Sequence, residues 1–244
     1  MALSLLLIAR ILMITAKEIK ESILHVLFPH VCAGCGSDLL NEESVLCIHC
    51  TAVLPETNFF IYADNPVEKM MWGRLPLVHA AAGYYFIKES LMQHLIHQFK
   101  YKGNKELGLQ LGRMLGKYIV QSGRFNADVL VPLPLFPEKE RSRGYNQASV
   151  LCEGMAAVMR VPVLNDAVVR PQHTETQTKK GRVERWKNME GKFVLQNKDA
   201  VRNKHVLLVD DVITTGATLE SCGSELLKGE NTRLSIATLC VASA

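Results

Sequence analysis

The sequence lacks several features, and each absence narrows the class of protein. No run of about 18 uninterrupted apolar residues occurs, so we expect no membrane-spanning helix. Charge of one sign is not in large excess: 28 Lys and Arg against 24 Asp and Glu leave +4, too mild to indicate nucleic-acid binding by itself. We expect no secretory signal, because Arg10 interrupts the apolar N-terminal run. Together with an odd number of cysteines, seven, this argues against a disulfide framework and for a cytoplasmic location.

Two familiar nucleotide-binding motifs are also missing. No Gly-x-Gly-x-x-Gly occurs, so a dinucleotide-binding fold would lack its fingerprint. The segment 112–118 (GRMLGKY) looks like a phosphate-binding P-loop, but it is one residue short and has no Ser or Thr after the lysine. We interpret this segment as ordinary helix.

The 244 residues suffice for one ordinary domain and a small one, and the 48% of hydrophobic residues can form a buried core. We divide the chain into residues 1–28, 29–54, 55–76 and 77–244. The first segment has the apolar spacing of an amphipathic helix that Pro29 would end. We expect this helix to pack on the protein or on a partner, with a membrane-surface helix as the alternative. Residues 55–76 contain three prolines and several turn residues, and we interpret them as a connector.

Residues 29–54 contain a pair of cysteine knuckles with the spacing Cys-x2-Cys, eleven residues, Cys-x2-Cys. The four cysteines are Cys32, Cys35, Cys47 and Cys50. Each two-residue spacing lets a tight turn direct two sulfurs at one ion, and Gly34 and Gly36 let backbone amides reach the thiolates. Four thiolates are the tetrahedral set that zinc prefers in structural sites, which leave no position for a catalytic water. We therefore predict a structural Zn²⁺, with two disulfides or four free thiols as the alternatives.

Residues 77–244 alternate between short apolar strands and amphipathic helices. The expected strands are 81–87, 128–131, 206–209 and 234–241, and the expected helices are 89–99, 106–120, 146–159 and 218–227. Continuous apolar strands that alternate with helices indicate an α/β fold with a parallel sheet covered on both faces. Ligands of such folds bind at the carboxyl ends of the strands. The residues that follow 128–131 and 206–209 are therefore the candidate site.

The segment 206–218 (VLLVDDVITTGAT) combines an apolar strand, two carboxylates and a hydroxyl-rich turn that begins a helix. The carboxylates are Asp210 and Asp211, and the turn is Thr214, Thr215, Gly216, Ala217 and Thr218. Backbone amides at a helix start, freed by Gly216, bind a phosphate dianion, while carboxylates accept hydrogen bonds from sugar hydroxyls. One element could thus bind a ribose and its 5′-phosphate together. The plainer alternative is an acidic strand end followed by a Thr-capped helix.

At every position this segment resembles the phosphoribosyl-diphosphate (PRPP) binding motif of type I phosphoribosyltransferases. The resemblance implies that Asp210 and Asp211 bind the ribose 2′ and 3′ hydroxyls and that the loop 214–218 binds the 5′-phosphate. It also implies the phosphoribosyltransferase fold for residues 77–244, and Mg²⁺ bound together with PRPP. Hypoxanthine-type relatives carry a carboxylate base where this chain has Thr214, whereas orotate-type enzymes share the threonine. No catalytic residue is therefore assigned.

A zinc knuckle pair ahead of such a domain is similar to the ComF family, which is linked to competence and DNA uptake. Residues 141–147 (RSRGYNQ) resemble the Arg-Gly-aromatic-Asn-Gln signature of that family, and residues 100–103 (KYKG) resemble its lysine-tyrosine segment. Residues 177–188 contribute further matches. The similarity extends over residues 29–244.

Basic residues near these motifs are candidates to neutralise a diphosphate bound beside the loop that follows 128–131. We assign Lys100 and Arg143 to PRPP binding, since arginine presents a planar fork that matches phosphate. Lys102 and Arg141 fit that role and the role of a solvated surface charge equally well. Residues 171–191 are polar and basic, and we expect either a flap that closes over the diphosphate or an exposed loop that contacts DNA.

Two functions follow from the sequence. The first is an enzyme that transfers a phosphoribosyl group from PRPP to an unidentified acceptor and releases pyrophosphate, in a protein linked to DNA uptake. The alternative is a non-catalytic PRPP- or nucleotide-binding adaptor for DNA uptake that interacts with a helicase-like partner. The mild net charge argues against a third interpretation, direct binding of single-stranded DNA. A homodimer is compatible with each of these functions.

Overall fold

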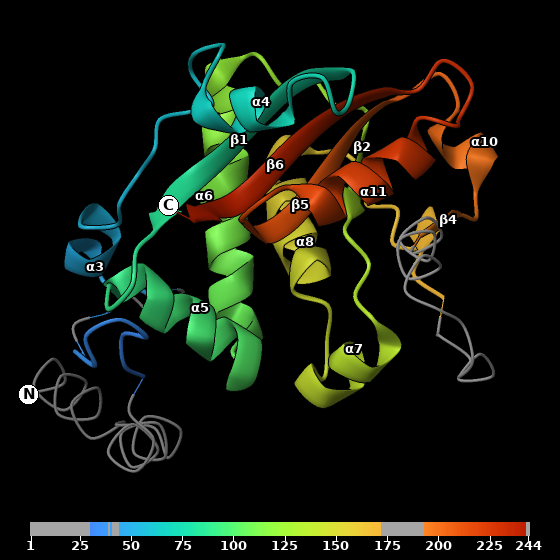
Figure 1. The fold of residues 1–244 in the computed structure, drawn as a ribbon. Coiled ribbons are helices and arrows are strands. Elements are labelled where there is room, and N and C mark those ends of the chain that lie inside the picture. Colours follow the sequence, from blue (N-terminus) through green and yellow to red (C-terminus); the bar gives the residue numbers. More distant parts are fainter. Residues whose placement is uncertain (1–29, 39, 41–43, 172–192, 243–244) are drawn as a thin grey trace, which may run out of the picture. The chain divides into compact units, whose positions relative to one another are not determined.

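A parallel sheet organises the C-terminal part of the chain. In the computed structural model, which describes residues 30–38, 40, 44–171 and 193–242, this sheet contains β1 (Leu77–Phe86), β2 (Val129–Pro132), β5 (His205–Ile213) and β6 (Arg233–Ala242). Their order is β1-β6-β5-β2, and each neighbouring pair is parallel (Figure 1). The central strands are continuous apolar runs because side chains on both of their faces are buried. The predicted α/β fold with a parallel sheet is confirmed.

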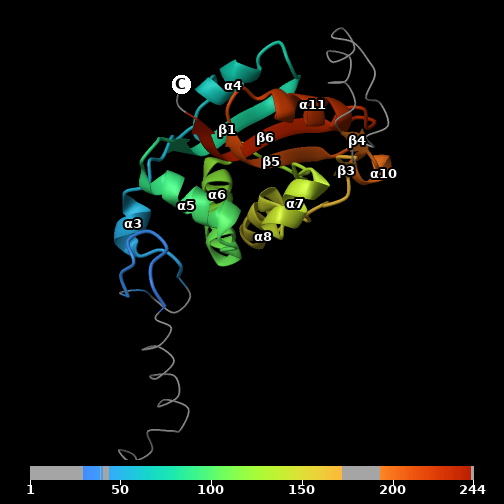
Figure 2. The ribbon, with the colours of Figure 1, turned by 60° about the horizontal axis from the view of Figure 1, so that its bottom comes forward.

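Helices cover both faces of this sheet. One face carries α5 (Leu91–Tyr101), α6 (Lys105–Ser122) and α8 (Gln147–Met159), and the other carries α4 (Pro66–Met71) and α11 (Ala217–Leu226) (Figure 2). The short helix α7 (Pro137–Arg143), which the sequence analysis did not predict, lies between β2 and α8 in the chain. Its residues are all at least partly exposed, so it has no apolar face by which periodicity could have revealed it.

The glycines of the P-loop-like segment 112–118 serve helix packing. This segment lies inside α6, as interpreted, and α6 packs against α8. A Cβ atom on Gly112 would lie 2.4 Å from the carbonyl oxygen of Leu151, and one on Gly154 would lie 2.3 Å from the carbonyl oxygen of Leu109. The two helix backbones therefore approach each other through paired glycines.

Residues 55–76 contain more structure than a connector requires. Phe59 and Phe60 are buried, and Asn65 caps α4 by accepting from the amides of Val67 and Glu68 at 3.0 and 3.1 Å. The side-chain amide of Asn65 also donates to the carbonyl oxygen of Ala80 on β1 at 2.8 Å. This segment thus covers part of the edge strand β1. The domain boundaries at residues 54 and 76 stay predictions.

The chain divides into two units, Met1–Thr51 and Ala52–Ala244. The first contains the four knuckle cysteines, and α3 (Ile48–Ala52) begins within it. The second contains the main sheet and a small antiparallel pair, β3 (Val168–Val169) and β4 (Val194–Leu195), followed by α10 (Lys198–Val201).

Two predictions lie outside the described residues. These are the N-terminal helix over 1–28 and nearly all of the flap over 171–191, of which only residue 171 is described. Among the helices in the described ranges, none is both long and apolar enough to cross a membrane.

Candidate functional site

Two carboxylates lie near the carboxyl end of β5. Asp210 and Asp211 follow the fully buried run 206–209. Asp211 is only 8% exposed, and its two carboxylate oxygens lie 2.9 and 2.8 Å from Nζ of Lys100, in the last turn of α5. The structure therefore brings together two residues that the sequence analysis assigned to one site although they stand 111 positions apart.

The two acids have different surroundings. Burial and the adjacent charge of Asp211 raise the pKa of Asp210, while the Asp211 amide, Lys100 and Arg143 act in the opposite direction. That amide donates to Oδ1 of Asp210 at 2.8 Å. Asp211 is thus ion-paired, whereas Asp210 is a poorly solvated carboxyl that would gain from a hydrogen-bond donor. Sugar hydroxyls are such donors.

A small cavity lies against the loop that follows β5. Its volume is about 40 Å³. It is lined by Asp210, Val212, Ile213, Thr214, Thr215, Gly216, Ala217, Thr218 and Leu219. The helix α11 begins at Ala217, with Gly216, which has no side chain to cap the first turn, as its N-cap at φ 75°. The amide of Ala217 donates to Oγ1 of Thr215 at 3.5 Å. The first amides of a helix have no intrahelical acceptor and carry partial positive charge, so this end of α11 suits a phosphate.

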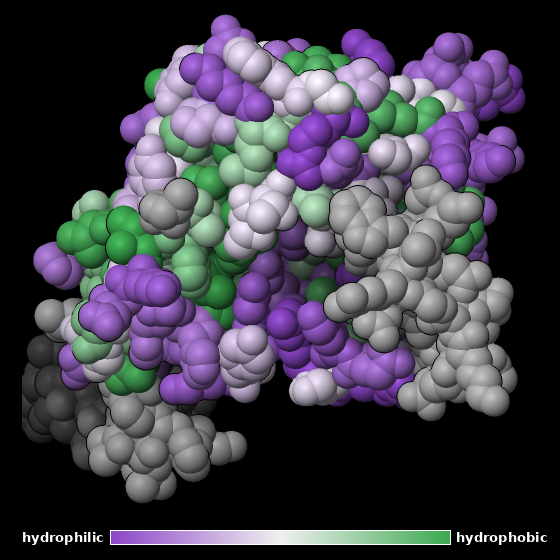
Figure 3. Space-filling view, in the orientation of Figure 1, coloured by the Kyte–Doolittle hydropathy of each residue, from purple (hydrophilic) through white to green (hydrophobic). Residues whose placement is uncertain are grey.

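The basic residues considered for a diphosphate differ in their placement. Lys100 contacts Asp211, and Arg143 ends α7, where its guanidinium donates to Oε1 of Gln147 at 2.7 Å. Arg141, whose side chain is 70% exposed, and Lys102 are surface charges in this structure. Figure 3 shows the hydrophilic side chains that gather over α7. Lys100 and Arg143 are therefore the two basic residues whose charges act to lower the pKa of Asp210.

The loop after β2 is anchored beside the acid pair. The amide of Leu133 donates to the carbonyl oxygen of Val209 on β5 at 2.8 Å. The side-chain amide of Asn146 donates to the carbonyl oxygen of Leu133 at 3.0 Å, and its oxygen caps α8. Asn146, part of the segment 141–147, thus ties this loop to the start of α8. The loops that follow β2 and β5 lie at the same edge of the sheet, as parallel strands require.

Arg74 and Glu220 contact the loop 214–218 and its helix, and the sequence analysis missed both. Nη1 of Arg74 donates to the carbonyl oxygen of Thr215 at 2.6 Å, and its Nε donates to Oε2 of Glu220 at 2.9 Å. Arg74 belongs to the segment interpreted as a connector and precedes Thr215 by 141 positions. No local pattern could have assigned it to the site.

The four cysteines predicted to hold zinc come together in space. Their sulfur atoms all lie within 4.8 Å of one another. The amides of Gly34 and Cys47 each donate to Sγ of Cys32 at 3.3 Å. Burial acts to raise the pKa of Cys32, but such backbone donors outweigh it and lower the pKa to about 6. This donor set is able to hold one metal ion.

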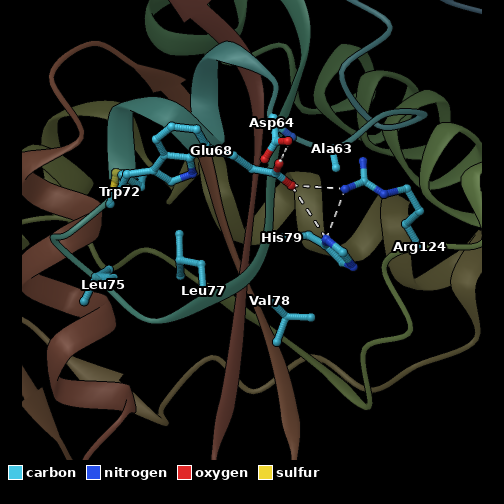
Figure 4. Close-up of a pocket in the computed structure, with 10 residues that line it drawn as sticks. Ala63, Asp64, Glu68, Trp72, Leu75, Leu77, Val78, His79 and Arg124 are labelled. Atoms are coloured by element: carbon cyan, nitrogen blue, oxygen red, sulfur yellow. Dashed lines mark hydrogen bonds and ion pairs between the residues drawn. The ribbon is translucent and has the colours of Figure 1, made fainter.

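A larger cavity, of about 280 Å³, lies beside α4 and the start of β1. Its polar groups contact one another: Nη2 of Arg124 lies 3.2 Å from both Oε1 of Glu68 and Nδ1 of His79 (Figure 4). Burial and the charge of Arg124 lower the pKa of His79. Arg124 also donates to the carbonyl oxygens of Phe60 and Tyr62. These groups are engaged in holding residues 60–68 to β1, so we assign them a structural role.

Comparison with known proteins gives the class first. Residues 146–244 match the family model of the phosphoribosyl transferase domain. The matched residues include β5, the loop 214–218 and α11. The chain thus contains a phosphoribosyl transferase domain, in agreement with its parallel sheet and with the motif predicted at residues 206–218.

Similar proteins of comparable length extend the likeness beyond that domain. Competence protein F of Haemophilus influenzae is 28% identical over 211 residues, which cover 84% of this chain and 87% of that protein. DNA utilization protein YhgH of Escherichia coli K12 is 27% identical over 215 residues, with 86% and 89% covered. Competence protein ComFC of Bacillus subtilis is 28% identical over 213 residues, with 86% and 83% covered. The chain is a homologue of these competence and DNA utilization proteins, and the predicted likeness to the ComF family is confirmed.

Proposed function

We propose that this protein binds PRPP and transfers its phosphoribosyl group to an acceptor with release of pyrophosphate. One observation carries the proposal: near the end of β5, the buried Asp211 and the partly buried Asp210 stand directly before a small cavity at the start of α11. The acids suit ribose hydroxyls, and the helix start suits the 5′-phosphate. The matching domain family supports the same assignment.

In this proposal, Asp210 and Asp211 accept hydrogen bonds from the ribose 2′ and 3′ hydroxyls, while residues 214–218 surround the 5′-phosphate. Two anchors on one ribose fix the direction in which its C1 faces. The bond from C1 to the pyrophosphate oxygen then breaks through an oxocarbenium-like state, and the acceptor forms the new bond to C1. Positioning and charge stabilisation account for most of the rate gain in such a displacement.

The diphosphate needs positive charge while it leaves. We assign this role to Lys100 and Arg143, because the positive charges of both act on Asp210 to lower its pKa. Arg143 can also offer a planar fork to phosphate oxygens. Mg²⁺, when bound with PRPP, supplies further neutralisation of the diphosphate. Because Lys100 is in contact with Asp211, its positive charge also reduces the repulsion between the two acids and an incoming anion.

The four-cysteine cluster is proposed as a structural Zn²⁺ site. Four sulfurs complete a tetrahedral shell and leave no open position for a substrate or water. Thiols stay reduced in the cytoplasm, which is the location that we propose.

A second candidate function is an adaptor for DNA uptake that binds PRPP or a nucleotide without turnover. The names of the similar proteins, which refer to competence and DNA utilization, favour it. Single-stranded DNA or a helicase-like protein would then be the partner. Steep weakening of single-strand binding with added salt would support direct contact with DNA.

Isothermal titration calorimetry with PRPP and Mg²⁺ tests the first proposal. We expect micromolar binding by the wild-type chain and its loss in the double variant Asp210→Asn, Asp211→Asn. The variant Asp166→Asn, in which an exposed carboxylate is removed instead, should bind as wild type does. Absence of binding by wild-type protein with its metal in place would refute the enzyme and leave the adaptor to be tested with DNA.

A further inference from the structure

Arg74 joins three separate pieces of the second unit. It stands three residues after the end of α4, and its Nη1 donates to the carbonyl oxygen of Thr215 at 2.6 Å. Its Nε donates to Oε2 of Glu220, in the first turn of α11, at 2.9 Å, and Nη2 contacts the same oxygen. Nη1 also lies 3.3 Å from the carbonyl oxygen of Met70 in α4. One guanidinium thus links α4, the loop 214–218 and α11.

The same side of the loop is closely packed. A Cβ atom on Gly216 would lie 2.7 Å from Sδ of Met71 and 3.3 Å from Nη1 of Arg74. Gly216 also adopts φ 75°, which side-chain-bearing residues rarely tolerate. The turn therefore rests directly on α4 and Arg74, with no space between them.

The contact with Thr215 determines where one loop amide points. The carbonyl group of Thr215 and the N–H group of Gly216 belong to a single planar trans peptide, in which the two bonds point in opposite directions. Because Arg74 holds that carbonyl oxygen, the Gly216 N–H is directed away from Arg74. Gly216 and Asp210 both line the 40 Å³ cavity.

The charge of Arg74 is already balanced by Glu220, so a long-range attraction for phosphate is not its main contribution. Its side chain is 28% exposed, so it is not a core residue either. What remains is geometric: a rigid fork that a lysine, with a single ammonium, cannot reproduce.

We infer that Arg74 is a positioning residue of the phosphate loop, which presets the Gly216 amide for the 5′-phosphate of PRPP. This inference rests on the proposed function for its ligand, but the order that Arg74 confers on the loop exists without ligand. It makes the segment 55–76 a working part of the site.

Amide hydrogen exchange on the unliganded full-length chain tests the positioning. In Arg74→Met and Arg74→Lys, the amide of Glu220, which donates to the carbonyl oxygen of Gly216 at 2.8 Å, should exchange faster by about tenfold, because a charge-assisted hydrogen bond that holds the turn is lost. The matched control is Arg202→Met, which breaks an exposed pair with Glu230 and should leave exchange of the Glu220 amide unchanged. Unchanged exchange of the Glu220 amide in both Arg74 variants would overturn the inference, and so would acceleration spread evenly over β5 and β6.

Ligand binding separates this inference from the proposed function. Arg74→Met should weaken PRPP and ribose 5-phosphate by about tenfold and leave Mg-pyrophosphate, which has no 5′-phosphate, within about twofold. Equal weakening of all three ligands would contradict the positioning role. If wild-type protein binds none of them, the proposed function fails, and the exchange data still decide whether Arg74 orders the loop.

Discussion

Lys100 and Asp211 form the ion pair on which the acid end of β5 depends. Both side chains are largely buried, and both carboxylate oxygens are close to the ammonium. Removal of one partner from such a pair leaves an uncompensated charge away from water. A substitution of either residue in the candidate site should therefore also change the stability of the protein.

Lys100→Met should lower the free energy of unfolding by about 3 kcal/mol, because it leaves Asp211 without its cation. The double variant Lys100→Met, Asp211→Asn should recover most of that loss, since both charges are then gone. Urea unfolding of the four proteins in the double-mutant cycle measures the coupling. Lys102→Met, at an exposed neighbour, serves as control, and additive effects in the cycle would contradict the prediction.

Asp210 should make stability depend on pH. Folding raises its pKa, so its contribution to stability is complete below the ordinary carboxyl pKa and is lost as the pH rises through the raised value. Asp210→Asn carries no such charge, so its free energy of unfolding should exceed that of wild type by about 1–2 kcal/mol at alkaline pH. Urea unfolding at about pH 5 and about pH 9 should show this difference growing with pH. A difference that stays constant would argue against a raised pKa.

At the scale of elements, α6 and α8 pack closely together on the face of the sheet that also carries α5 (Figure 2). Gly112 and Gly154 face each other's backbones, which explains why a P-loop-like glycine spacing occurs in a helix. Alanine is the better helix former, so propensity and packing make opposite predictions at these positions.

Packing should decide the outcome. Gly112→Ala gains about 1 kcal/mol of helix propensity, but its methyl group would overlap the carbonyl oxygen of Leu151 at 2.4 Å. We expect a net destabilisation of about 2 kcal/mol, measured by thermal unfolding. Lys117→Ala, at an exposed position of the same helix, should change stability by less than about 0.5 kcal/mol. A Gly112→Ala variant as stable as wild type would show that the helices can separate freely.

At the scale of the whole molecule, the chain combines a four-cysteine unit with a larger unit, of which residues 146–244 match the phosphoribosyl transferase domain. The first has few buried apolar residues among its described positions, and Cys32, Leu46 and Cys50 are among them. So small a core needs a further source of stability, which a bound metal can supply.

The purified chain should contain one zinc ion per molecule, and Cys35→Ser should lose most of it, because a tetrahedral shell is then incomplete. Cys152→Ala, which removes a buried thiol far from the cluster in sequence, should retain the metal. Elemental analysis together with amide exchange over residues 30–51 measures both content and order. Zinc retained in Cys35→Ser, or absent from wild type, would contradict the assignment.

Features that depend on neighbours in the chain were predictable from the sequence alone. The spacing of the four cysteines, the strand and turn of residues 206–218 and the alternation that indicates a parallel sheet all arise from local geometry, and the fold and the cysteine cluster agree with them. The helix α7 escaped prediction because it buries no face.

Other features were decided by the tertiary structure. Lys100 meets Asp211 across 111 positions, and Arg74 meets Thr215 across 141. The turn-rich segment 55–76 becomes a layer on β1 because Asn65, Glu68 and Thr57 find hydrogen-bond partners on that strand. Each of these contacts depends on how helices and strands pack, and a linear pattern of residue types contains no information about which distant side chain will face which backbone atom. The sequence by itself therefore determined the kind of fold and singled out the loop that we propose for phosphate, and only the packed structure decided which residues contact that loop.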